Sequence, residues 1–219
     1  SAPFHSIHEA VEKARKDQNS TTIYLREGKY VLDKPLMLTS DDGNDSKELI
    51  IKNYPGEKTV LSSGIVLDLK WEKYKNGIMR AVVKGSPVMD MLFVNGELKS
   101  MARYPNYDEK AVRFNGTSAL ATAPERVKKW KCPEGGYLHA MHKHDWGDFH
   151  YRITGKNEKG ELQLEGGWQN NRPMGIHNEN RMVENIFEEL DAPGEWYYDK
   201  QEGWLYYYPL SDENINELV

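Results

Sequence analysis

Three short apolar runs of β-type residues lie in the stretch Thr21-Thr-Ile-Tyr-Leu-Arg-Glu-Gly-Lys-Tyr-Val-Leu-Asp-Lys-Pro-Leu-Met-Leu38, at 22–25, 30–32 and 36–38. Only turn residues such as Gly28 and Pro35 separate them. Strands this short, with no helix between them, cannot be joined by the crossovers of an α/β sheet. They are typical of a chain that turns a corner after every strand, as a solenoid does.

Two further apolar runs follow, at 49–52 and 60–62. We expect 22–25 and 49–52 to be equivalent strands of successive coils, and 36–38 and 60–62 to be the next equivalent pair. The chain would then contain about two coils, which is fewer than an independent solenoid needs.

A helix is predicted over 7–16, ahead of the first coil. Ser6 is placed to cap it, Glu9 follows three residues later as a capping-box partner, and apolar residues from Ile7 to Ala14 share one face. Because the open end of a solenoid exposes apolar surface and unpaired strand edges, we interpret this helix as a cap.

From Ile65 the pattern changes to alternating strands joined by hairpin signals. Asn76-Gly77 and Asn95-Gly96 each lie between two such strands, and this dipeptide is a strong hairpin signal. This spacing predicts an antiparallel sandwich or open barrel. The later predicted strands are 137–142, 149–154, 161–164, 181–184, 195–199 and 204–208, with helical turns at 123–129 and 185–190.

Composition restricts the class of protein. The hydrophobic content of 38% is low, but 13 Tyr, 6 Trp and 5 Phe supply too much apolar area for a disordered chain. The net charge of −5 and the lack of a basic stripe argue against nucleic acid as a partner. No apolar run is long enough for a membrane span. The single cysteine, Cys132, excludes an internal disulfide framework.

The chemistry-bearing residues gather between 139 and 150. An aromatic ring flanked by carboxylates is a common sugar-binding arrangement, although hydrogen bonding near a turn is a competing explanation. Two of the histidines would face the same side of a strand, but no spacing matches a zinc motif, so we predict neither a metal nor a cofactor. Polar loops near 169–172 and 178–181 suit hydroxyl and carboxylate recognition on sugars, or ordinary turn chemistry. The candidate substrate-binding residues are His142, His144, Asp145, Trp146, Asp148 and Arg172.

Several longer blocks stand together in the chain. They are Pro3-Phe-x-Ser-Ile-x-Glu-Ala10, Ile23-Tyr-Leu-Arg-Glu-Gly-Lys-Tyr30, Tyr54-Pro-Gly-Glu-Lys-x-Val-Leu61, Leu92-Phe-Val-Asn-Gly-Glu97, Ala102-Arg-Tyr-Pro-Asn106, Asp145-Trp-x-Asp148 and Leu190-Asp-Ala-Pro-Gly-Glu-Trp-Tyr-Tyr-Asp199. The first three resemble the start of right-handed parallel β-helix proteins of the pectate-lyase-like type. The others resemble a group of bacterial polysaccharide-processing β-helix proteins that includes glycoside hydrolase families 120 and 141.

The resemblance implies an all-β chain in three parts. Residues 1–66 would be the capping helix and first coils of a right-handed parallel β-helix. Residues 67–209 would be an inserted antiparallel β-sandwich or barrel-like domain, and 210–219 would return toward the β-helix. In these families later coils carry the catalytic carboxylates, and this chain stops about where the helix would resume. The resemblance therefore assigns no catalytic residue here.

The function implied is that of the N-terminal portion of a secreted or periplasmic polysaccharide-degrading enzyme, a glycoside hydrolase, with its signal peptide removed. Its partners would be a polysaccharide or oligosaccharide and the remaining β-helix, and this portion alone would be inactive. A non-catalytic carbohydrate-binding or surface-attachment module is the alternative. A polysaccharide lyase is a third interpretation, and whether the parent is an enzyme stays open.

Overall fold

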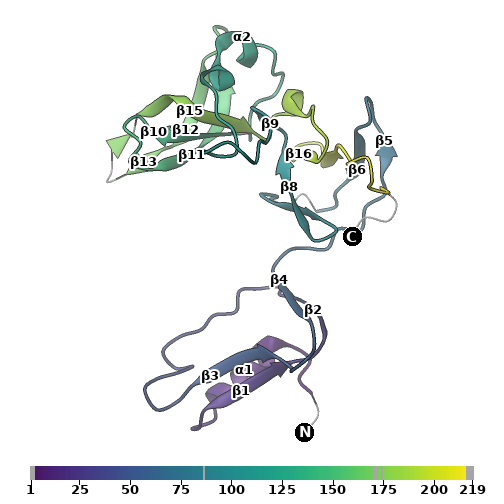
Figure 1. The fold of residues 1–219 in the computed structure, drawn as a ribbon, viewed down its shortest axis with the longest axis vertical. Coiled ribbons are helices and arrows are strands. Elements are labelled where there is room, and N and C mark those ends of the chain that lie inside the picture. The colour runs from purple at the N-terminus through teal and green to yellow at the C-terminus, as the bar shows by residue number, and fades with distance from the viewer. Residues whose placement is uncertain (1–2, 86, 170–171, 174, 216–219) are drawn as a thin grey trace. The chain divides into compact units, whose positions relative to one another are not determined.

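A computed structural model describes residues 3–85, 87–169, 172–173 and 175–215, and it confirms a mostly β chain with few helices (Figure 1). The chain forms two compact units, Ser1–Leu67 and Asp68–Val219. Among the described residues, no helix is both long and apolar enough to cross a bilayer.

The elements of the first unit are α1 (Ile7–Arg15), β1 (Thr21–Leu25), β2 (Gly28–Val31), β3 (Leu49–Asn53) and β4 (Thr59–Ser62). Those of the second unit are β5 (Glu72–Lys73), β6 (Met79–Val82), β7 (Leu92–Val94), β8 (Glu97–Met101), β9 (Arg103–Tyr104), η1 (Ala119–Thr122), α2 (Pro124–Val127), β10 (Tyr137–His142), β11 (Asp148–Lys156), β12 (Leu162–Gly166), β13 (Trp168–Gln169), β14 (Arg172–Pro173), β15 (Ile176–Glu184), η2 (Phe187–Glu189), β16 (Glu195–Asp199) and β17 (Trp204–Tyr207).

Helix α1 begins and packs as its sequence predicts. The Ser6 Oγ accepts the N–H of Glu9 at 3.1 Å, and Ile7 and Val11 pack against Leu25 of β1. The predicted capping box forms only in part, because the Glu9 carboxylate accepts the N–H of His5, at 3.1 Å. The Glu9 side chain therefore bonds to the residue before the N-cap Ser6, and not to Ser6 itself.

Parallel pairing joins the short strands of the first unit. Strand β1 pairs with β3, which confirms the predicted equivalence of 22–25 and 49–52. The second predicted pair is wrong, because β4 pairs with β2 and residues 36–38 form no strand.

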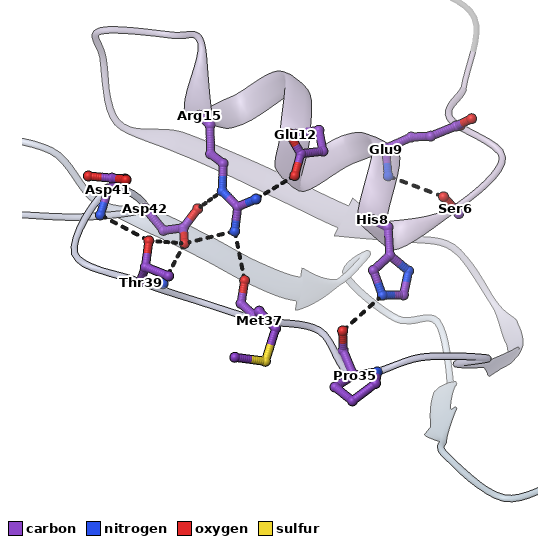
Figure 2. Close-up of polar contacts among 10 residues, drawn as sticks. All are labelled: Ser6, His8, Glu9, Glu12, Arg15, Pro35, Met37, Thr39, Asp41 and Asp42. Atoms are coloured by element: carbon purple, nitrogen blue, oxygen red, sulfur yellow. Dashed lines mark hydrogen bonds and ion pairs between the residues drawn. The ribbon is translucent and has the colours of Figure 1, made fainter.

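Side chains of α1, rather than a neighbouring strand, hold the segment after β2. Arg15 donates from Nε to Oδ1 of Asp42 at 2.7 Å and from Nη2 to the carbonyl oxygen of Met37 at 2.7 Å (Figure 2). The Asp42 carboxylate also accepts the N–H of Thr39, at 2.7 Å. His8 of the same helix reaches the carbonyl oxygen of Pro35 (Figure 2). Residues 36–38 thus lie beside α1, held by its side chains, and not in a strand ladder.

Both Asn-Gly turns form the hairpins that the sequence predicts. Asn76 and Gly77 have φ of 51° and 82°, and Asn95 and Gly96 have φ of 53° and 82°. Positive φ at both central residues defines a type I′ turn, whose twist matches the flanking strands. The turns accordingly join β5 to β6 and β7 to β8.

A five-stranded antiparallel sheet in the order β12-β11-β10-β15-β9 positions most candidate residues. Alternate residues of β10, Leu138 and Ala140, face a core to which η1, α2 and the buried Trp130 contribute. The side chains of Tyr137 and His139 alternate with them and lie on the opposite face of the sheet.

The remaining long sheet is mixed, in the order β5-β6-β17-β16-β8-β7. The aromatic runs 196–198 and 204–208 lie in its two central strands and in the residue that follows β17. Trp196 and Tyr207 are fully buried, and Tyr197 and Tyr206 belong to a core cluster. Four of these rings, Trp196, Tyr197, Tyr206 and Tyr207, are therefore core residues, whereas Trp204 and Tyr208 are partly buried.

Candidate functional site

The hairpin between β10 and β11 carries the exposed aromatic residue of the candidate set. Trp146 lies at its tip with 76% of its surface exposed. His142, 4% exposed, lies beneath it with ring centroids 5.3 Å apart and an interplanar angle of 23°. The Nδ1 atom of His142 accepts the backbone N–H of His144 at 3.2 Å. The buried imidazole therefore supports the indole ring in a fixed orientation at the surface.

Asp145 precedes Trp146 and connects the hairpin to two other segments. Its Oδ1 accepts Nη1 of Arg113 at 2.8 Å and Nδ2 of Asn180 at 3.4 Å. His177 Nε2 lies 3.8 Å from the same oxygen. Because Nδ1 of His177 accepts two backbone N–H groups, its proton lies on Nε2, toward the carboxylate. One carboxylate oxygen thus gathers the loop after β9 and strand β15 around the hairpin.

Asp148 has a separate role on the outward face of the sheet. Its Oδ2 lies 2.7 Å from Nε2 of His139, and Nε2 of His150 lies 3.3 Å from Oε1 of Glu184. The two imidazole rings touch edge to face, with centroids 4.0 Å apart. The cross-strand pair His139 and His150 therefore joins two histidine–carboxylate contacts into one cluster.

The two histidines of this cluster titrate differently. Burial lowers the pKa of His139 below its ordinary value, although Asp148 opposes the shift. The hydrogen bond to Glu184 raises the pKa of His150. On acidification His150 therefore takes up a proton before His139.

The loop over residues 105–117 is held in an unusual conformation. Arg103 is 5% exposed and donates to the carbonyl oxygens of Pro105, Phe114 and Gly116 at 2.8 to 2.9 Å. Phe114 and Asn115 have φ of 49° and 51°, which is a strained conformation for a bulky side chain such as phenylalanine. The Phe114 ring stacks on His139, with centroids 4.0 Å apart.

This loop and β15 enclose a depression of about 500 Å³ beside the hairpin. Most of its lining is polar, and Arg113 and Asn180 connect it to Asp145. The lining residues are Pro105, Asn106, Asp108, Ala111, Val112, Arg113, Gly116, Thr117 and Asn180.

The structure brings together part of the predicted residue set. His142, His144, Asp145 and Trp146 form one group at the hairpin, whereas Asp148 joins the histidine cluster of the sheet face. The side chain of Arg172 lies outside the described residues. In the parts of the chain that the structure describes, no group of three or more His, Cys, Asp or Glu is placed to hold a metal ion.

Sequence reasoning missed Arg103, Arg113 and Phe114. The only local signal was Asn115-Gly116, a turn dipeptide that predicts positive φ but not a ligand site. Arg181, which belongs to an amide-rich segment considered for sugar recognition, instead donates to the carbonyl oxygen of Ala119.

Comparison with known proteins identifies a fold relative. Neither the known family models nor the curated protein sequences match this chain. A solved structure described as a glycoside hydrolase aligns with a TM-score of 0.70 and 23% sequence identity, over 99% of this chain and 41% of that one. The chain thus spans about two fifths of the length of that protein, and at this identity the likeness shows a shared fold.

Proposed function

We propose that this chain is a glycan-contacting portion of a carbohydrate-active protein, a glycoside hydrolase whose catalytic carboxylates lie in a part of the protein beyond these residues. The parallel pairs β1–β3 and β2–β4 would be the first coils of a right-handed β-helix, and the second unit an inserted domain. The fold shared with a protein described as a glycoside hydrolase supports this proposal. Secretion and a polysaccharide substrate belong to the same proposal.

One observation carries the glycan-contacting role. The Trp146 ring is exposed on a hairpin whose geometry is fixed from below by the buried His142. An exposed indole face leaves apolar surface in contact with water, which is unfavourable. A sugar ring, which has an apolar face and a polar rim, would cover this surface.

The test is a change of Trp146 to alanine, with binding of polysaccharides measured by calorimetry or affinity electrophoresis. We expect Trp146→Ala to weaken glycan binding about tenfold or more, because buried tryptophan contacts dominate many interfaces. The matched control is Phe93→Ala, which removes an exposed ring, 55% exposed, from the six-stranded sheet. Equal affinity of wild type and Trp146→Ala would overturn the role of this ring.

The second candidate function is a non-catalytic carbohydrate-binding module. The same Trp146 surface favours it, because an exposed ring binds sugars without any catalytic carboxylate. Glycosidase assays on the longer parent protein separate the two functions. Hydrolysis there, with binding but no turnover by this chain, supports the enzyme; binding without hydrolysis in either supports the module.

A further inference from the structure

We propose that the depression lined by Arg113 and Asn180 is a subsite for one sugar residue. These two side chains and the Asp145 carboxylate that both contact, at the edge of the depression, would bind two adjacent hydroxyl groups. This inference rests on the proposed glycan-contacting function and names a second point of contact, distinct from the Trp146 ring. Its three residues come from the hairpin, the loop after β9 and strand β15.

The donors and acceptors of these residues match a pair of hydroxyls. The contacts of Arg113 and Asn180 both converge on Oδ1 of Asp145, so within the described residues Oδ2 is left as an acceptor. A guanidinium has five N–H donors and a side-chain amide has two, so each retains donors after bonding to Asp145. Two adjacent hydroxyls can then donate to the carboxylate and accept from the guanidinium and the amide.

Partial exposure keeps these groups accessible. The side chains of Arg113 and Asp145 are 37% and 41% exposed, so each is fixed by its partner yet still reaches solvent. A ligand that replaces water here meets groups that are already oriented, which lowers the entropic cost of binding.

The wall of the subsite is rigid for a separate reason. The three carbonyl oxygens bound by buried Arg103 include those of Phe114 and Gly116, on either side of Asn115. Strained residues of this kind persist only when surrounding contacts hold them, and they gather at ligand sites. Here the hydrogen bonds of Arg103 hold Phe114 in its positive-φ conformation, within the loop that presents Arg113 to Asp145.

The charges around the depression favour uncharged hydroxyl groups of a ligand over an anionic group. The positive charge of Arg113 is already paired with Asp145, and Asp108 adds a further carboxylate to the lining. A carboxylate or phosphate ligand would therefore meet two negative charges and one shared cation. Uncharged hydroxyl groups meet no such repulsion.

The experiment measures calorimetric affinities of the whole chain for tetrasaccharides of xylose, glucose, galactose and mannose. Arg113→Ala and Asn180→Ala are compared with wild type and with Lys110→Ala, a control that removes an exposed cation from the same loop without touching the lining. Thermal melting confirms that each variant folds. For the tightest ligand, analogues lacking single hydroxyls are then measured against each protein.

We expect affinity losses of about fivefold for Asn180→Ala and about tenfold for Arg113→Ala, with Lys110→Ala unchanged. An analogue that lacks the hydroxyl bound by Asn180 should bind wild type and Asn180→Ala with equal affinity, because the contact that Asn180 makes is already absent. If Trp146→Ala loses binding while Arg113→Ala and Asn180→Ala keep wild-type affinity for every ligand, the subsite is refuted and the proposed function stands. If wild type binds none of the tetrasaccharides and no polysaccharide, both are refuted.

Discussion

A buried carboxyl group makes the stability of the second unit depend on pH. Glu195 is the first residue of β16 and is 2% exposed. Its Oε2 accepts the N–H groups of Asp191 and Ala192, both at 3.2 Å. Burial nevertheless dominates, and it raises the pKa of Glu195 from 4.5 to about 7. The folded protein therefore holds this proton more tightly than the unfolded chain does.

The sign of the effect follows from this difference. Below the unfolded pKa, Glu195 is protonated in both states and contributes no penalty. As pH rises from 4.5 through about 7, the unfolded chain ionises first and gains stability relative to the fold. A shift of this size corresponds to a loss of roughly 3 kcal/mol of unfolding free energy, at 1.36 kcal/mol for each pKa unit.

Glu195→Gln removes this titration and keeps an acceptor oxygen for the two N–H groups. Urea denaturation of wild type and variant, followed by tryptophan fluorescence, measures the unfolding free energy from about pH 5 to pH 8. We expect wild type to lose roughly 2.5 kcal/mol more than Glu195→Gln across this range, because the unfolded carboxyl group is already largely ionised at pH 5. The control Glu202→Gln, at an exposed position, should follow wild type. Parallel curves for wild type and Glu195→Gln would refute the reasoning.

Two further predictions test the turns and the histidine cluster. Gly77 and Gly96 share a φ of 82°, but a Cβ at Gly77 would lie 3.1 Å from the Tyr208 ring, whereas one at Gly96 meets nothing within 4 Å. Urea denaturation should show a loss of about 1 kcal/mol for Gly96→Ala and roughly 1 kcal/mol more for Gly77→Ala, and equal losses would exclude the contact with the ring. In NMR titrations of the imidazole resonances, Glu184→Gln should lower the pKa of His150, because their hydrogen bond is what raises it. An unchanged titration midpoint would show that Glu184 does not stabilise the charged imidazole.

Local sequence signals predicted most elements of this fold. Strands β10 and β16 have the predicted limits, and both Asn-Gly turns have the predicted backbone. These signals succeed because period-two alternation and positive φ depend on a few neighbouring residues. The second predicted strand pair was wrong, because β4 pairs with β2, and which of two short apolar runs pairs with a distant strand is a long-range choice that local pattern does not encode.

The candidate site was predicted only where its residues are neighbours in the chain. Trp146 and its supporting histidine lie on one hairpin, so their proximity follows from the strand pattern. Arg113 reaches Asp145 from a distant loop, and no local pattern relates the two. Arg103, which holds that loop, lies in the block 102–106 that the sequence singled out, but nothing in that block indicates that its side chain binds three carbonyl oxygens.

By itself, the sequence determined the all-β class, the N-terminal amphipathic helix, the hairpins and an aromatic residue between carboxylates, because each depends on contacts within a short segment. Only the tertiary structure decided which strands pair in parallel, which rings of the aromatic runs 196–198 and 204–208 are buried, and which side chains surround Asp145. The physical reason is that burial, parallel pairing and ion pairing between distant segments depend on the packing of the whole unit. The alternation of apolar and polar residues along a strand does not reveal which distant segment, or which ligand, a side chain contacts.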